Sequence, residues 1–271
     1  MLPNREWFPS LFVPPCLRAF CPEAMPETPN PKLTRLLDPP TEVAAGEPDY
    51  AELDVATNFS FLRGASHPDE LVFTSAMLGQ RAMAVTDVNT LAGVVRAHAA
   101  AKQVKGFRLV IGARLQLTDA PDLLVWATDR AAYGRLCRLL TLGKRRTEKG
   151  ECLLSLQDFL DHSQGMLAAL DTGAGGTEAR RHGGTKSEQN ISDPGSTSCL
   201  RAFVPPCLDL LRLLRDALGD RISLAACCPY GSDDVGALHE LDELSRATHV
   251  PLVATNHVHY HDAAPGRCRT W

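Results

Sequence analysis

The chain has 271 residues and a mass of 29.4 kDa, and 44% of its residues are hydrophobic and 22% charged. This composition is typical of a globular protein, and a net charge of −4 argues against a whole-chain polyanion binder. No apolar run reaches the roughly 18 residues of a membrane span, and the N-terminus does not resemble a secretory signal. We therefore expect a cytoplasmic protein with no membrane partner.

Residues 1–49 are rich in proline and acidic side chains, which predicts a disordered tail. The tail contains FVPPCLRAF at Phe12–Phe20, and the same nine-residue unit returns in another phase as CLRAFVPPC at Cys199–Cys207. The second copy closes a stretch of low complexity, rich in Gly, Ser and Thr. We interpret 173–206 as an insertion in the fold, and a functional flexible loop is the alternative.

Between tail and insertion, strand-like and helix-like segments alternate. Ala51–Thr57 alternates polar and apolar residues as a strand does, and Ser66 or Asp69 could cap the helix that follows. The predicted elements are a helix at Glu70–Leu78, a strand at Arg81–Asp87, a helix at Leu91–Val104, strands at Phe107–Leu117 and Asp122–Ala127, helices at Arg130–Leu142 and Leu156–Asp161, and a strand at Gly165–Leu170.

The same alternation continues after the insertion. A helix is predicted at about Leu208–Leu218, a strand at Arg221–Cys227, a helix at Asp233–Thr248 and a strand at Val250–Asn256. Apolar strands alternating with helices favour a parallel sheet, and about seven strands in one domain favour a closed (β/α)7 barrel over residues 50–262. Functional sites of such barrels lie at the C-terminal ends of the strands, here Asp54–Arg63, Asp87–Asn89, Gly112–Arg114 and Asn256–His261.

Several sequence motifs that include these strand ends carry a family resemblance. They are NFSFLRGASHPDEL at Asn58–Leu71, AVTDVNTLAGVVRAHAAAK at Ala84–Lys102, VIGARLQL at Val110–Leu117, the stretch Asp122–Cys152, and VPLVATNHVHYHD at Val250–Asp262. Together they resemble the PHP (polymerase and histidinol phosphatase) domain that opens bacterial C-family DNA polymerases of the alpha-subunit type. The resemblance is closest to their error-prone, damage-inducible branch, and residues 263–271 depart from the family pattern.

The resemblance also shows where metal ligands are expected and which residues stand there instead. Metal-competent members begin with His-x-His and an Asp seven residues later, where this chain has Asp54, Ala56 and Arg63. A family His after Thr-Asp corresponds to Val88, and a Glu two residues after Gly corresponds to Arg114.

The last two family positions lie further along the chain. A His that opens the next strand corresponds to Asp122, and the closing Asp-x-His corresponds to His257-Val258-His259, in which His259 alone keeps the ligand of the family. Most of the ligands that the resemblance would carry over are therefore replaced.

These replacements predict a domain without a metal cluster. Two fixed cations where divalent ions would bind repel them by several kcal/mol at an effective dielectric constant of about 20, and Ala56 and Val88 offer no lone pair. We therefore expect no catalytic residue, no cofactor and no phosphatase or nuclease activity in this chain. His257 and His259 stay weak candidates for a metal, with polar residues at a strand end as the alternative.

The resemblance implies a fragment of an error-prone DNA polymerase involved in repair and translesion synthesis. The polymerase core, other damage-tolerance replication proteins and DNA are the implied partners, and the Mg²⁺ of nucleotide transfer belongs to the polymerase part. Zn²⁺ or Mn²⁺ would bind only in metal-competent relatives.

Two alternatives stay open. One is a metal-free barrel that is encoded separately and acts as a scaffold, and the other is a free-standing PHP phosphoesterase with an altered site. The basic stretch Arg135–Lys149 could contact a phosphate backbone or be a solvated helix face.

Overall fold

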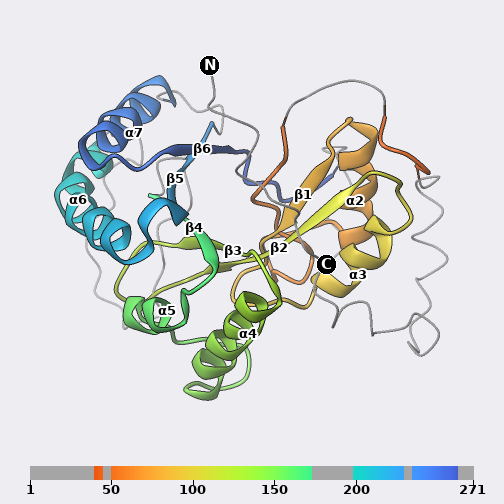
Figure 1. The fold of residues 1–271 in the computed structure, drawn as a ribbon, viewed down its shortest axis with the longest axis horizontal. Coiled ribbons are helices and arrows are strands. Elements are labelled where there is room, and N and C mark those ends of the chain that lie inside the picture. The colour runs from red at the N-terminus through yellow and green to blue at the C-terminus, as the bar shows by residue number, and fades with distance from the viewer. Residues whose placement is uncertain (1–39, 45–49, 173–197, 229–233, 262–271) are drawn as a thin grey trace, which may run out of the picture. The chain divides into compact units, whose positions relative to one another are not determined.

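The computed structural model describes residues 40–44, 50–172, 198–228 and 234–261 (Figure 1). Most of the predicted tail, the first copy of the nine-residue repeat, 173–197 and 262–271 lie outside the described residues. The chain divides into two compact units, one formed by Met1–Ala168 with Asn256–Trp271 and the other by Ala169–Thr255. The fold is mixed α/β, with strands and helices alternating along most of the chain.

The first part of the larger unit consists of α2 (Pro68–Met77), β1 (Ala82–Val85), α3 (Val94–Ala101) and β2 (Arg108–Leu115). β1 and β2 are parallel, with Ala82 beside Arg108 and Val85 beside Ile111. Strand residues such as Met83 and Leu109 bury their side chains in one core with Leu71 and Phe73 of α2 and Ala97 of α3. This core fixes the C-terminal ends of β1 and β2, where functional residues were expected.

The N-terminus of α2 differs from the prediction. The helix begins after His67, whose backbone N–H donates to the Glu70 carboxylate at 2.9 Å, so neither Ser66 nor Asp69 is the cap. Ser66 instead lies within 2.7 Å of the His261 ring, far along the chain. Long-range contact therefore outweighs the local capping preference of serine.

The larger unit continues with β3 (Leu123–Ala127), α4 (Arg130–Arg145), α5 (Leu156–His162) and β4 (Met166–Leu170), which runs into the smaller unit. β3 is antiparallel to β2, with Gly112 beside Trp126, so the prediction of a wholly parallel sheet is wrong at this pair. The seven residues between the two strands are too few for a crossover helix, and the chain turns back.

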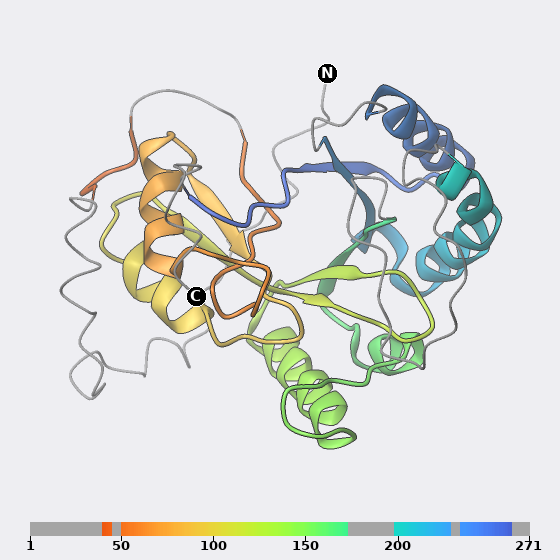
Figure 2. The same ribbon diagram turned by 180° about the vertical axis from the view of Figure 1, so that it is seen from behind.

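The smaller unit holds α6 (Ser198–Leu218), the short 3₁₀ helix η2 (Gly219–Arg221), β5 (Ile222–Cys227), α7 (Asp234–Thr248) and β6 (Leu252–Thr255). β5 and β6 are parallel, as predicted, and both helices pack on these strands (Figure 2). α6 begins at Ser198 rather than at about Leu208, so it includes residues assigned to the insertion. In the described part of the chain, no helix is long and apolar enough to cross a membrane.

Candidate functional site

Asp54 lies on a segment that the sequence predicted as a strand, Ala51–Thr57. In the structure this segment makes only isolated parallel bridges, from Glu52 to Met83 and from Val55 to Val258. It is nevertheless held on both sides. The backbone N–H of Ala84 donates to the Glu52 carbonyl at 2.7 Å, and that of Val258 donates to the Asp54 carbonyl at 2.9 Å. Asp54 is thereby placed between the end of β1 and the 256–261 segment.

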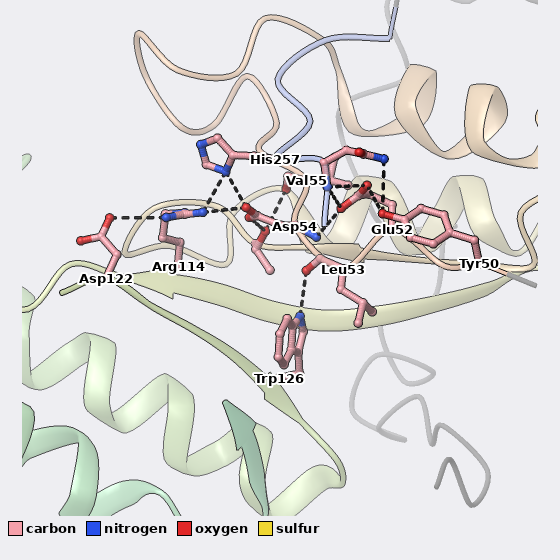
Figure 3. Close-up of polar contacts among 11 residues, drawn as sticks. Tyr50, Glu52, Leu53, Asp54, Val55, Arg114, Asp122, Trp126 and His257 are labelled. Carbon is pink, nitrogen blue, oxygen red and sulfur yellow. Dashed lines mark hydrogen bonds and ion pairs between the residues drawn. The ribbon is translucent and has the colours of Figure 1, made fainter. Parts of the chain in front are cut away.

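The Asp54 carboxylate is buried, and its two oxygens contact three polar partners from distant parts of the chain. Oδ1 accepts from the Thr86 hydroxyl at 2.8 Å. Oδ2 accepts from the Arg114 guanidinium at 2.6 Å and lies 2.5 Å from Nδ1 of His257 (Figure 3). Burial by itself raises the pKa of Asp54, but the hydrogen bond from His257 and the charge of Arg114 outweigh it and lower the pKa from 3.8 to about 2.

Arg114 lies on β2 and is only 2% exposed, which is exceptional for a guanidinium. Besides Asp54, it pairs with the Asp122 carboxylate at 3.6 Å, so two carboxylates face one cation (Figure 3). The guanidinium therefore contacts two residues, Asp54 and Asp122, that stand where the family resemblance places metal ligands. A buried cation in this position repels a divalent metal ion and satisfies the carboxylates that would bind one.

His257 completes the cluster. Its Nδ1 lies 2.5 Å from Asp54 and 2.8 Å from the Arg114 guanidinium, which cannot accept a hydrogen bond. We assign the proton to Nδ1, because the Asp54 carboxylate is the acceptor beside it. The ring of His259 stands edge-on to that of His257, with the centroids 4.3 Å apart, and burial lowers the pKa of His259, so His259 is held as neutral imidazole near pH 7.

The other predicted positions do not join this cluster. Ala56 is buried and Val88 half-buried, and neither has a side-chain donor or acceptor. The Arg63 side chain is exposed, so of the two arginines at former ligand positions only Arg114 is buried. Among the residues that the structure describes, no three His, Cys, Asp or Glu side chains are grouped so as to hold a metal ion. The donor set does not fit a metal cluster, and whether the protein binds one stays a prediction.

Two buried carboxylates that the sequence analysis did not assign organise the surroundings of Asp54. Glu52 accepts from the backbone N–H groups of Asp54 at 3.0 Å and of Asn256 at 3.1 Å, so it joins the 50s segment to the 256–261 segment. Burial raises its pKa. The signal in the sequence was the spacing of Glu52 and Asp54, because alternate residues of an extended segment face the same side.

Asp87, at the end of β1, holds the loop that follows Thr57. It accepts from the backbone N–H of Thr57 at 2.8 Å, from the Thr57 hydroxyl and from the Ser60 hydroxyl at 2.6 Å. Burial raises the pKa of Asp87 in spite of these hydrogen bonds. Both oxygens of the Asp87 carboxylate accept hydrogen bonds from residues 57–60, so Asp87 acts as an anchor of the loop.

The comparisons with known proteins agree with the resemblance. The family model described as "PHP domain" matches residues 52–186. An error-prone DNA polymerase of Rhodopirellula baltica is 42% identical over 215 residues, and one of Caulobacter vibrioides is 44% identical over 222 residues. Both matches cover 79% of this chain, which spans only 17% of the length of each relative.

A solved structure supports the fold. The crystal structure of a putative metal-dependent phosphoesterase from Bifidobacterium adolescentis superposes with a TM-score of 0.51 over 78% of this chain and 88% of the other, at 13% sequence identity. At this identity the likeness concerns the fold alone. The family match and the relatives together place the chain in the PHP domain family, on the branch found in bacterial error-prone DNA polymerases.

Proposed function

We propose that this chain is the PHP domain of an error-prone DNA polymerase and that it supports the polymerase without hydrolysing phosphate esters. The observation that carries the proposal is the buried guanidinium of Arg114, 2.6 Å from Asp54 and 3.6 Å from Asp122. An internal cation of this kind does not dissociate, so it takes over the charge balance of the carboxylates permanently. The strand ends are then held together by the protein alone.

The wider setting belongs to the same proposal. The relatives are named as error-prone DNA polymerases, and this chain spans 17% of their length. We infer a cytoplasmic role in repair and translesion synthesis, with the polymerase core, damage-tolerance proteins and DNA as partners. Mg²⁺ would act in the polymerase part and not in this chain. A (β/α)7 barrel over residues 50–262, with an insertion at 173–206, is the architecture that we propose for the domain.

The first experiment separates this proposal from the alternative, a free-standing metal-dependent phosphoesterase. The full chain is incubated with Zn²⁺ or Mn²⁺, dialysed and examined by elemental analysis, and phosphate release from p-nitrophenyl phosphate is followed. We expect less than one metal ion per chain and no release above the rate without protein. A stoichiometric metal content together with turnover would establish the phosphoesterase instead.

The second experiment tests the supporting role. Three proteins are compared in primer extension on undamaged and abasic templates: the Caulobacter vibrioides relative, that protein without the region matched by this chain, and a chimera with this chain's residues 50–262 in that region. We expect the deletion to lose activity and the chimera to retain most of it. A folded chimera as inactive as the deletion, or a deletion with full activity, would contradict the proposed role.

A further inference from the structure

Helix α4 and the turn after it concentrate positive charge in an otherwise acidic chain. From Arg130 to Lys149 there are seven basic residues and one acidic residue, a formal charge of +6, whereas the whole chain carries −4. Such a local excess is the usual electrostatic footprint of a nucleic-acid-binding surface. Solvated helix faces also carry charge, so the arrangement of these side chains has to decide between the two.

Two of the seven basic side chains are engaged in holding the fold. Arg146 makes a two-pronged ion pair with Asp158, at 2.5 and 2.9 Å, and Arg135 donates to the Gln164 carbonyl at 2.8 Å. The remaining five have no ion pair with any residue that the structure describes, and Arg130, Arg138, Lys144, Arg145 and Lys149 are all exposed. These five residues are called the basic face below.

The basic face has a regular geometry. The buried side of α4 is formed by Ala132, Leu136, Leu139, Leu140 and Gly143. On a helix of 3.6 residues per turn, Arg130, Arg138 and Arg145 fall on the opposite side, spread over about 22 Å. α4 begins just after β3, and the turn that follows α4 lies at the end of the helix away from β3 (Figures 1 and 2). At about 3.4 Å of helix axis per phosphate, one strand of a duplex places about six phosphates along that length.

Helix stability does not explain the whole pattern. Lys144 and Arg145 lie in the last turn, where a positive charge interacts favourably with the helix dipole. Arg130, in contrast, occupies the first position of α4, where the same dipole disfavours a cation, and Arg138 lies in the middle. At these two positions an external anionic partner gives a physical reason for positive charge.

We propose that the basic face binds the phosphate backbone of duplex nucleic acid without reading its sequence. No large hydrophobic side chain between 130 and 149 is exposed, and Tyr133 is partly buried against the core, so the surface offers neither an apolar anchor for a protein nor a ring on which unpaired bases could stack. Fixed charges in a row suit a regular polyanion, whose binding is strengthened by counterion release. The inference rests on the charges of this chain and does not depend on the role proposed for Arg114.

The test uses the full chain and a fluorescein-labelled 20-base-pair duplex of arbitrary sequence, with anisotropy measured between 50 and 200 mM KCl. The variant Arg138→Glu/Lys144→Glu/Arg145→Glu reverses three charges of the basic face. Its matched control, Arg81→Glu/Lys102→Glu/Arg108→Glu, makes the same change of net charge at three exposed residues outside α4. A milder variant, Arg138→Gln/Lys144→Gln/Arg145→Gln, covers the possibility that reversal unfolds the helix, and circular dichroism reports folding.

We expect wild type and control to bind the duplex with similar affinity, and the reversed variant to bind at least about tenfold more weakly at 50 mM KCl. The slope of log K against log[KCl] should fall by about 3 in the variants, because each lost phosphate contact removes about 0.9. Equal binding by wild type and folded variants would overturn the proposal, as would a loss of equal size in the control. Binding of polyglutamate with the same dependence on the basic face, but no binding of duplex, would assign the surface to an acidic protein instead.

Discussion

Replacing Arg114 by methionine removes the buried cation while keeping most of the side-chain volume. The Asp54 carboxylate is 2% exposed and then keeps only Thr86 and His257 as partners. Opposite charges about 4 Å apart interact by about 4 kcal/mol at an effective dielectric constant of about 20, and breaking a buried pair typically costs about 3–5 kcal/mol. Because His257 remains, we expect the free energy of unfolding at pH 7 to fall by about 3 kcal/mol.

Urea unfolding followed by circular dichroism and by tryptophan fluorescence measures this loss. Trp126 is a useful reporter because its indole N–H donates to the Leu53 carbonyl, one residue before Asp54. Arg63→Met is the matched control: it also removes an arginine from a former ligand position, but the side chain is exposed, so a change within about 0.5 kcal/mol is expected. The double variant Arg114→Met/Asp54→Asn should recover part of the loss, because position 54 then carries no buried charge that has lost its cation.

A result in which Arg114→Met and Arg63→Met lose equally little stability would refute the reasoning. It would mean that the Arg114 guanidinium does not compensate the charge of Asp54 in solution. A double variant less stable than Arg114→Met alone would also count against it, since the carboxylate would then be stabilising without its cation.

Three further predictions concern the same unit. The folded-state pKa of Asp54, about 2, lies below its ordinary value of 3.8. Ionised Asp54 therefore stabilises the fold above about pH 4, and that contribution is lost as the pH falls through about 2. Between pH 5 and pH 2, the free energy of unfolding should therefore fall more steeply with decreasing pH for wild type than for Asp54→Asn. A Cβ at Gly64 would lie 2.0 Å from the Thr57 carbonyl oxygen, so Gly64→Ala should lower the free energy of unfolding in urea by at least about 1–3 kcal/mol. Gly134 lies within α4 with open space around it, so Gly134→Ala should raise the free energy of unfolding by about 0.5–1 kcal/mol. Asp87→Ala removes the acceptor of the Thr57 N–H, and hydrogen exchange of that amide should accelerate at least tenfold; unchanged protection would show that Asp87 does not hold the loop.

The order and type of the elements after Pro68 could be predicted from the sequence, because the apolar periodicities of strands and helices are local properties. The predicted and observed boundaries of α4 and α5 agree at the N-terminal end and differ by at most three residues at the C-terminal end. The antiparallel return of β3 was missed, although the shortness of the link before Leu123 indicates it. The hydrophobic pattern of a segment predicts that it is a strand, but the length of the connection before it decides whether the strand runs parallel or antiparallel to its neighbour.

At the site, the sequence by itself determined which lone pairs are missing, since Ala56 and Val88 cannot bind a metal in any conformation. Only the tertiary structure decided what the two arginines do. Arg114 lies on a buried strand and its guanidinium points to Asp54, while Arg63 lies on a loop and faces solvent. The direction of a charged side chain depends on partners that folding brings from distant parts of the chain, such as Asp122 and His257. A single sequence does not show which of these distant residues come into contact.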